Sequence, residues 1–411
     1  MKTPMLLSPL RRGPFRLLWA GMGASYAGDR LQELAQAWLV ATLTGSSALA
    51  VGWISVLASL PQLLMPLGGV IADQVDRRRL LIAGQLAGAA AAAVVGTLVI
   101  VERIAPWHIY AWALISGLIW LFSRPAYKVV LTEAVPPDEV RSAVALNSMT
   151  ETAAMVVMNA AGSVLLGVIG LPIAFLLNAS SYTIAAGSLW RLPGLGRRPA
   201  SRPEGLSARG MLSNLREGLV YLIRQPRLLY PLLFTFITVT VATPAVGLLA
   251  AVVHKRGGSI ISLGLLTGSA SLGAFSGALF AGSKDEGPHP TRRYAWYGVG
   301  AATALVLFAL APVSVISSLS LAIIGFAIFA EVVWNTSRVR LLAEPAFQAR
   351  LQSITSLVFA LGGAIGQLWG GVALDQFGMV GLIGGAGVLG ALSVGVLFSV
   401  RHSSATAARR G

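Results

Sequence analysis

The chain contains no cysteine among its 411 residues. Without a thiol it can form neither a disulfide framework nor a thiolate metal site. Histidine occurs at four scattered positions that show no metal-ligand spacing: His108, His254, His289 and His402. We therefore expect neither a metal centre nor a cofactor.

Charged residues are also scarce, at 11% of the chain. A soluble domain carries about 25%. Hydrophobic residues account for 55% of the sequence, which is more than a water-soluble globule could hide. The composition therefore predicts a protein whose solvent is membrane lipid.

Acidic residues are fewer than basic ones: the chain has 16 Asp and Glu and 31 Lys and Arg, which give a formal net charge of +15. In a soluble protein this excess would suggest nucleic acid. In a membrane protein, basic loops fix the topology. The aromatic residues lie in apolar runs and not among the basic residues, so we expect no nucleic-acid partner.

Motifs of nucleotide hydrolysis and of hydrolytic catalysis are missing as well. There is no glycine-rich loop ending in Lys-Ser or Lys-Thr, no HExxH and no nucleophile elbow. We assign no catalytic residue and expect that the protein is not an enzyme.

Long apolar runs dominate what is present. A helix needs about 20 mostly apolar residues to cross a bilayer. Twelve stretches qualify: 15–43, 48–71, 80–102, 106–131, 142–168, 171–192, 228–254, 260–282, 293–311, 314–337, 351–376 and 380–400. The sequence thus predicts an all-α membrane protein with twelve transmembrane helices in two pseudo-symmetric six-helix bundles.

The predicted halves are residues 1–192 and 228–411, joined by a linker at 193–227 that is rich in Pro, Gly, Ser and Arg. The later part of the linker, MLSNLREGLVYLI, has helical spacing and is expected along the membrane surface. A Gly-rich stretch at 162–170 aligns with 370–378 at an offset of 208, which supports duplication of a six-helix unit.

The basic residues indicate the orientation. With both termini cytoplasmic, nearly all of them fall in cytoplasmic loops and tails, and the opposite side holds only Arg103, Lys255 and Arg256. This asymmetry follows the positive-inside rule. We expect a multi-pass protein of the inner, cytoplasmic membrane, with the basic start of the chain as a cytoplasmic tail and not a secretory signal.

The first predicted span carries a polar stripe. Ser25, Asp29, Gln32 and Gln36 follow i, i+4, i+7, i+11 spacing. Beside the stripe lie two further charges, Arg30 and Glu33, which a helix can pair on its own surface. Two interpretations remain open: the charges neutralise one another, or the stripe lines a cavity in which Asp29 or Glu33 takes up a proton.

Later spans carry further candidates for the substrate or proton site: Arg124, Glu151, Glu331 and Asn335. We predict that Arg124 can pair with Glu151, and that Arg338 can pair with Glu331. The alternative for residues near the cytoplasmic ends, such as Lys128 and Arg338, is that they reach water by snorkelling.

The loop between spans 2 and 3 holds the densest charge cluster. Its residues Gly69-Val-Ile-Ala-Asp73-Gln-Val-Asp-Arg77-Arg78 resemble the loop 2–3 signature of the major facilitator superfamily. Asp76 stands in place of the usual second Gly of that signature. This variant resembles the macrolide and siderophore (enterobactin) exporter branch of the superfamily. The stretches FRLLWAGMGASYAGDRLQELAQAWLVATLTGSSALAVG, SRPAYKVVLTEAVPPDEVRSAVALNS and IAFLLNASSY also resemble that branch. The Gly-Pro pair that exporters carry late in span 5 is absent from Met158 to Ser163.

The resemblance implies a gating role for Gly69, Asp73, Arg77 and Arg78. Asp73 is expected to meet the amino terminus of span 11 near residues 351–353, where free amides favour negative charge. Such a contact would latch the cytoplasmic side. The alternative is that Asp73 caps the start of span 3.

The preferred function is a secondary active transporter that exports a hydrophobic or amphipathic small molecule, of drug or siderophore type, by proton-coupled alternating access. A lipid or lysophospholipid flippase is the alternative, and a membrane-embedded enzyme or a binding-only receptor is less favoured. The expected partners are the small-molecule substrate, protons and membrane lipid. The resemblance implies a monomer.

Overall fold

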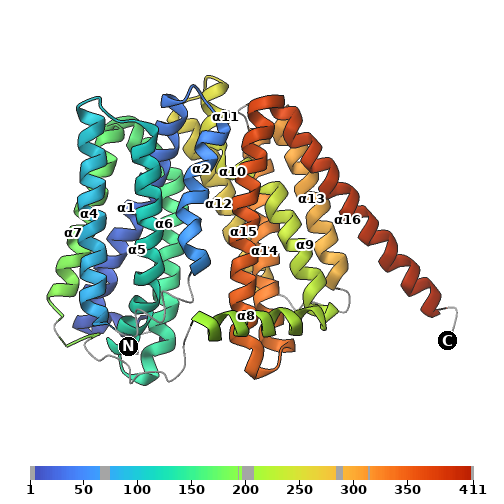
Figure 1. Cartoon of the computed structure of the whole chain (residues 1–411), viewed down its shortest axis with the longest axis horizontal. Helices are drawn as coiled ribbons and strands as arrows, with labels where there is room; N and C mark the ends of the chain where they lie inside the picture. Colours follow the sequence, from blue (N-terminus) through green and yellow to red (C-terminus); the bar gives the residue numbers. More distant parts are fainter. Residues whose placement is uncertain are drawn as a thin grey trace. The chain divides into compact units, whose positions relative to one another are not determined.

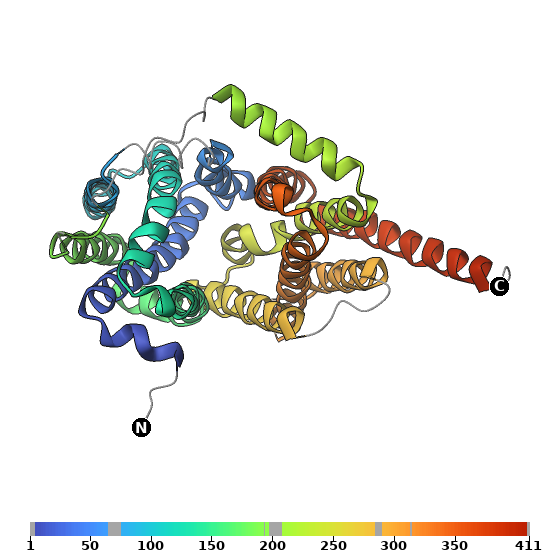
Figure 2. The ribbon, with the colours of Figure 1, turned by 90° about the horizontal axis from the view of Figure 1, so that it is seen from below.

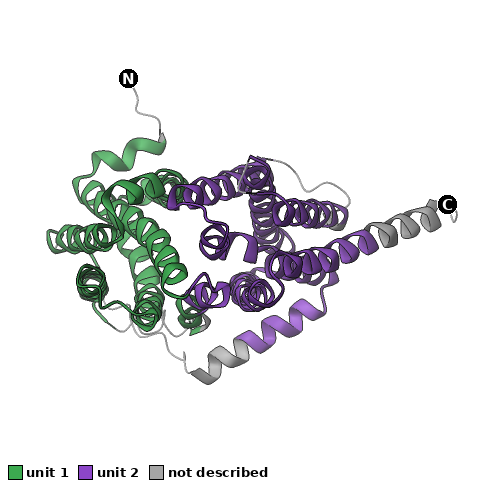
Figure 3. Cartoon of the chain, turned by 90° about the horizontal axis from the view of Figure 1, so that it is seen from above, with its two compact units in different colours: residues 1–44, 57–210 green, residues 45–56, 211–411 purple. Residues whose placement is uncertain are grey.

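A computed structural model of the chain describes residues 5–64, 75–192, 194–196, 208–283, 290–312 and 315–408. Within these ranges every regular element is a helix, as the sequence predicts. The chain divides into two compact units, residues 1–44 with 57–210 and residues 45–56 with 211–411 (Figure 3). Each unit is described by itself.

Unit 1 is built mainly from long helices (Figure 1). They are η1 (Met5–Arg11), α1 (Gly13–Leu43), η2 (Leu60–Leu64), α4 (Arg77–Ile100), α5 (Pro106–Glu133), η3 (Pro137–Glu139), α6 (Val140–Ile169) and α7 (Leu171–Trp190). α1 packs against α6 and α7, and α4 packs against α5 and α7. The fully buried Phe15, Leu18 and Leu81 belong to the apolar core of this unit.

Unit 2 contains most of α2 (Ala48–Ser59) and the helices that follow residue 210. They are α8 (Ala208–Ile223), α9 (Pro226–Ala242), α10 (Pro244–Gly247), α11 (Leu249–Lys255), α12 (Ile260–Ser283), α13 (Pro290–Leu310), α14 (Val315–Leu342), α15 (Pro345–Phe377) and α16 (Met379–Ala408). α14 packs against α12 and α13, while α9 lies on α15. Figure 2 shows several of these helices close to end-on, whereas α8 and α16 are seen from the side.

The predicted span 228–254 is broken into α9, α10 and α11. The break follows from Pro244, which has no N–H and cannot bond the carbonyl of Thr240. Trp369 on α15 replaces the missing donor, because its Nε1 lies 2.7 Å from Thr240 O. Gln367 Nε2 donates to Thr243 O at 3.3 Å, a carbonyl that also accepts from Gly247 N at 2.8 Å. A broken helix is tolerated in apolar surroundings only when another donor satisfies the freed carbonyl, here that of Thr240.

Helix α8 crosses the ends of α9, α14 and α15 in Figure 1. It is held there by an ion pair of 2.8 Å between Glu217 and Arg350 and by the stacked rings of Tyr221 and Phe347. The helical spacing predicted for the later part of the linker is confirmed. Its place along the membrane surface stays a prediction.

Nine helices in the described ranges are long and apolar enough to cross a membrane. The predicted spans 15–43, 48–71 and 171–192 are not among them. Both the first and the third are helical, as α1 and α7, and the first carries the charged residues Asp29, Arg30 and Glu33. The described part of the second ends at Leu64. The count of twelve spans therefore stays a prediction.

Candidate functional site

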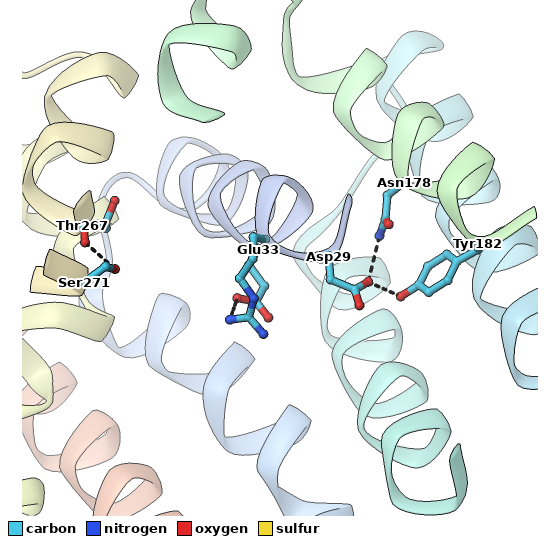
Figure 4. A network of polar contacts seen from close by, with 7 residues as sticks. Asp29, Glu33, Asn178, Tyr182, Thr267 and Ser271 are labelled. Atoms are coloured by element: carbon cyan, nitrogen blue, oxygen red, sulfur yellow. Dashed lines mark hydrogen bonds and ion pairs between the residues drawn. The ribbon is translucent and has the colours of Figure 1, made fainter. Parts of the chain in front are cut away.

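The polar stripe of α1 lies against α7 in unit 1. Asp29 Oδ1 accepts hydrogen bonds from Tyr182 Oη at 2.5 Å and from Asn178 Nδ2 at 3.3 Å. Figure 4 shows both α7 side chains pointing toward the carboxylate. Gly28 permits this close approach, because a Cβ atom there would overlap Asn178 and Ser181. The charge of Asp29 is thus met by two neutral donors from another helix.

The two glutamines of the stripe are buried, with exposed fractions of 1% for Gln32 and 8% for Gln36. Gln32 Oε1 accepts from Asn178 Nδ2 at 2.6 Å. Among the described residues, Gln32 Nε2 and Gln36 Oε1 have no hydrogen-bond partner. Because an unsatisfied buried polar atom costs about 1–3 kcal/mol, these two atoms are available for a polar ligand.

Two of the ion pairs in unit 1 involve predicted site residues. Arg30 pairs with Glu33 at 2.6 Å on the surface of α1, as the i, i+3 spacing predicts. Arg124 on α5 pairs with Glu151 on α6 at 3.1 Å, which confirms the predicted pairing. The Arg124 guanidinium also lies 4.8 Å from the ring centroid of Trp120. All four charged side chains remain partly exposed, so these pairs are weak enough to exchange partners.

A second polar cluster lies between α9, α13 and α14 in unit 2. Glu331 is fully buried, with an exposed fraction of 0%. Its Oε1 accepts from Thr238 Oγ1 at 3.3 Å. Its neighbour Asn335 donates to Thr235 Oγ1 at 2.7 Å and accepts from Tyr294 Oη at 3.2 Å. The cluster is therefore made of neutral donors around one carboxyl group.

The predicted pair between Arg338 and Glu331 is wrong. Arg338 Nη1 donates instead to the backbone oxygen of Arg227 at 3.0 Å, and its guanidinium lies 5.5 Å from the Tyr294 ring centroid. Residues 331 and 338 are two turns apart, about 10 Å along the helix axis, so the carbonyl at the start of α9 is within easier reach. The second carboxyl oxygen of Glu331, Oε2, has no hydrogen-bond partner in the described chain.

The surroundings of Glu331 determine what it can do. An ionised carboxylate without a positive partner costs several kcal/mol to bury. A bound proton or a cationic ligand removes that cost. Beside the cluster lies a small cavity of about 10 Å³, lined in part by Asn335, Arg338 and Thr355. The arrangement is suited to holding a proton within the bundle.

The charge cluster between spans 2 and 3 is described only in part. Gly69 and Asp73 lie outside the described residues. Arg77 is buried, and Arg78 donates to Leu189 O at 2.9 Å and to Trp190 O at 2.7 Å, at the end of α7. The start of α4 is capped by Asp76, which accepts from Arg79 N at 3.0 Å. The predicted latch through Asp73 therefore stays a prediction.

Arg256, one of three basic residues predicted on the extracytoplasmic side, has a structural role. It donates to Ala311 O at 2.8 Å and to Ala309 O at 3.0 Å, at the end of α13. Burial lowers the pKa of its guanidinium. Arg256 is thus tied to the end of a neighbouring helix.

Several site residues escaped the sequence prediction, above all Asn178, Tyr182, Thr238 and Tyr294. Asn178 and Tyr182 are spaced i, i+4 in an apolar segment, a signal that could have revealed them. No comparable local signal marks Thr238 or Tyr294, which follow from tertiary packing. Among the described residues, no group of three or more His, Cys, Asp or Glu side chains could hold a metal ion.

The chain was compared with known proteins. The model of the transmembrane secretion effector family matches residues 5–410. The uncharacterized MFS-type transporter YfiS of Bacillus subtilis is 26% identical over 235 residues, which are 57% of this chain and 54% of that protein. Macrolide efflux protein A of Streptococcus pyogenes is 25% identical over 222 residues, 53% of each. The chain spans about half the length of the curated relatives it matches.

Solved transporters share the fold. A bacterial homolog of the human lysosomal transporter Spinster, in an inward-facing and occupied conformation, has a TM-score of 0.71 at 14% identity, covering 96% of this chain and 97% of that one. Nucleoside transporter NupG has a TM-score of 0.64 at 14% identity, covering 94% and 98%. At these identities the likeness shows the fold alone. Because the family model spans nearly the whole chain, the protein belongs to the transmembrane secretion effectors of the major facilitator superfamily, a family of multi-pass membrane transporters and not of enzymes.

Proposed function

We propose that the protein exports a hydrophobic or amphipathic small molecule by proton-coupled alternating access. The observation that carries the coupling is the fully buried Glu331 carboxyl, which has one oxygen without a hydrogen-bond partner among the described residues. The name of one relative, macrolide efflux protein A, supports the direction and the substrate class. Apolar helices with few polar groups are better suited to binding a hydrophobic substrate than a sugar.

Asp29 is the second proton-site candidate, and Arg30, Gln32, Glu33, Gln36, Arg124, Glu151 and Asn335 are proposed to serve the substrate or the proton. The unsatisfied atoms of Gln32 and Gln36 support this assignment. We also propose that the chain forms two six-helix halves, residues 1–192 and 228–411, which are joined by a cytoplasmic linker at 193–227. The basic-residue asymmetry supports an inner-membrane location with both termini cytoplasmic. The acting form is a monomer.

Flux into proteoliposomes tests the function. Purified protein is reconstituted into vesicles, a macrolide or a fluorescent amphipathic dye is added outside them, and a pH gradient is imposed. The expected result is dye or macrolide movement that needs both the protein and the gradient. A fluorescent lysophospholipid in the same vesicles tests the flippase. Lysophospholipid flipping without movement of the other probes would overturn the proposal in favour of that alternative.

Variants of the gating cluster test the mechanism. Asp73→Asn is expected to keep membrane insertion, to favour the inward-open state and to slow transport, because it weakens attraction to a helix amino terminus. Spin-label distances between the two units report the conformational distribution. Wild-type transport together with an unchanged distribution would leave the cluster with a topological role only.

A further inference from the structure

The first turn of α2 is capped by a carboxylate from the far end of α15. Asp375 Oδ1 accepts from Ala48 N at 2.7 Å, and Oδ2 accepts from Leu49 N at 3.1 Å and from Ser47 Oγ at 2.7 Å. Helix amino termini leave their first N–H groups without intrahelical partners and favour negative charge. More than 320 residues separate the carboxylate from the helix that it caps, so this is a tertiary contact.

Close packing accompanies the cap. A Cβ atom on Gly371 would lie 2.7 Å from Leu49 Cα, and one on Gly52 would lie 2.8 Å from Gln367 O. Real Cβ atoms do not approach so closely, so both positions require glycine while α2 and α15 remain in this contact. The first half of α2 therefore rests directly on α15.

The capped segment has an unusual place in the chain. Residues 45–56 belong to unit 2, whereas the chain before them and the chain from Leu57 onward belong to unit 1. α2 runs from Ala48 to Ser59, so the division passes through one continuous helix (Figure 3). The Asp375 carboxylate thus holds residues 45–56 within unit 2, although the chain on either side of this segment belongs to unit 1.

The turn before α2 is held in the same way. Gly45 and Ser46 have φ angles of 61° and 69°, a region that a residue with a side chain adopts rarely. Ser46 Oγ lies 2.7 Å from His254 Nδ1 at the end of α11. A second contact within unit 2 therefore stabilises a turn that local preference disfavours.

A short repeat connects this cap with the charge cluster between spans 2 and 3. Residues Gly370-Gly-Val-Ala-Leu-Asp-Gln-Phe377 match Gly68-Gly-Val-Ile-Ala-Asp-Gln-Val75 at five of eight positions, and Asp375 aligns with Asp73. In the predicted topology, span 2 ends on the cytoplasmic side and span 11 ends on the opposite side. The same motif therefore stands once on each side of the membrane.

We propose that Asp375 is a positioning residue of the transport cycle, a latch that keeps the extracytoplasmic side closed by holding the amino terminus of α2 on α15. The inference rests on the proposed alternating-access function. Asp375 is exposed to solvent, so its hydrogen bonds compete with water and can break in each cycle. Release of α2 opens the extracytoplasmic side, as release of Asp73 is proposed to open the cytoplasmic one.

Spin-label distances in the full chain test the latch, and the absence of native cysteine makes labelling specific. One pair, Arg103→Cys with Lys255→Cys, reports the predicted extracytoplasmic side. A second pair, Arg191→Cys with Arg340→Cys, reports the cytoplasmic side. All four residues are exposed. Asp375→Asn is expected to raise the ratio of long to short distances in the first pair by about fivefold, the change expected when a charged cap is lost.

Two further variants keep the test decisive. Ser47→Ala retains the carboxylate but removes the Ser47 hydroxyl, which donates to Asp375 and accepts from Ala50 N at 3.2 Å, so a smaller shift in the same direction is expected. Glu133→Gln is the matched control, because Glu133 accepts from the backbone N of Gly196 at 2.7 Å within unit 1; it should leave the first pair unchanged. If Asp375→Asn fails to fold, Ser47→Ala tests the latch instead: longer distances in the first pair support it, and unchanged or shorter distances contradict it.

The distances are measured without substrate, so they separate the latch from the proposed function. Unchanged distances in Asp375→Asn and Ser47→Ala, or an equal shift in Glu133→Gln, would overturn the latch whatever the flux. A shifted first pair in a chain that moves neither macrolide nor dye would retain the latch and overturn the proposed substrate class.

Discussion

The two units differ in how they hydrogen-bond a carboxyl group that lies among their helices. In unit 1, Asp29 receives hydrogen bonds from Tyr182 and Asn178, and Arg30 follows it on the same helix. In unit 2, Glu331 is fully buried, and one of its oxygens has no hydrogen-bond partner among the described residues. Hydrogen bonds from neutral donors favour the ionised form of a carboxylate. An unsatisfied one needs a proton or a cation, so the two positions are suited to different steps of a cycle.

The largest effect is expected from reversing the charge at Glu331. Glu331→Lys buries a cation among neutral donors, which costs about 3–5 kcal/mol, whereas Glu331→Gln keeps the shape without a charge and should stay within about 1 kcal/mol of wild type. Thermal unfolding of the purified protein in detergent measures both. Destabilisation by glutamine as large as that by lysine would show that the site requires the negative charge of Glu331.

Neutralising Asp29 is expected to have the next largest effect. Asp29→Asn retains a hydrogen-bond acceptor for Tyr182 and the fold, but it removes a group that can exchange a proton. We expect pH-gradient-driven flux to fall about three- to tenfold, within the usual contribution of one acid–base group, while equilibrium binding of the substrate changes less. An unchanged pH dependence of flux would remove Asp29 from the coupling.

Removing a donor should make Asp29 resemble Glu331. Tyr182→Phe deletes the bond of 2.5 Å to Asp29, and a hydrogen bond to a charged group contributes about 1.5–3 kcal/mol. Thermal unfolding should therefore show a loss of that order for Tyr182→Phe in a wild-type background. The loss should shrink in an Asp29→Asn background, and equal losses in the two backgrounds would contradict the assigned contact.

The smallest effect is expected at Glu33. Its ion pair with Arg30 is half exposed, at 25% for Arg30 and 48% for Glu33, and exposed pairs contribute about 0–1 kcal/mol. Glu33→Gln should therefore change stability little and reduce gradient-driven flux less than Asp29→Asn does. A larger loss of flux in Glu33→Gln would exchange the roles of the two carboxylates.

The sequence predicts local features well and tertiary ones poorly. The pair between Arg30 and Glu33 follows from helical spacing alone, and the polar stripe of α1 is visible in the same way. The partners of Asp29 come from α7, 149 or more residues away, where the packing of two helices decides which donors arrive. The charged residues of α1 keep it out of the set of helices that are apolar enough to cross a membrane, so the count of twelve cannot be read from hydropathy alone.

Packing also explains the incorrect pairing of Arg338. Its charge and its helix are evident from the sequence, but the nearest acceptor is the backbone oxygen of Arg227 at the start of α9. The break at Pro244 could be expected from the residue itself. The donor that makes the break tolerable, Trp369, lies on a helix that follows more than 120 residues later, and no local pattern marks it.

The most direct test of the account compares pH-gradient-driven flux with substrate counterflow in one preparation of proteoliposomes. Counterflow exchanges labelled for unlabelled macrolide or dye and needs no net proton movement. In wild type, the gradient should stimulate flux. In Glu331→Gln, counterflow should persist while gradient stimulation is lost, with the exposed variant Glu217→Gln behaving as wild type. Equal gradient stimulation in wild type and Glu331→Gln would contradict the claim that Glu331 carries the coupling proton.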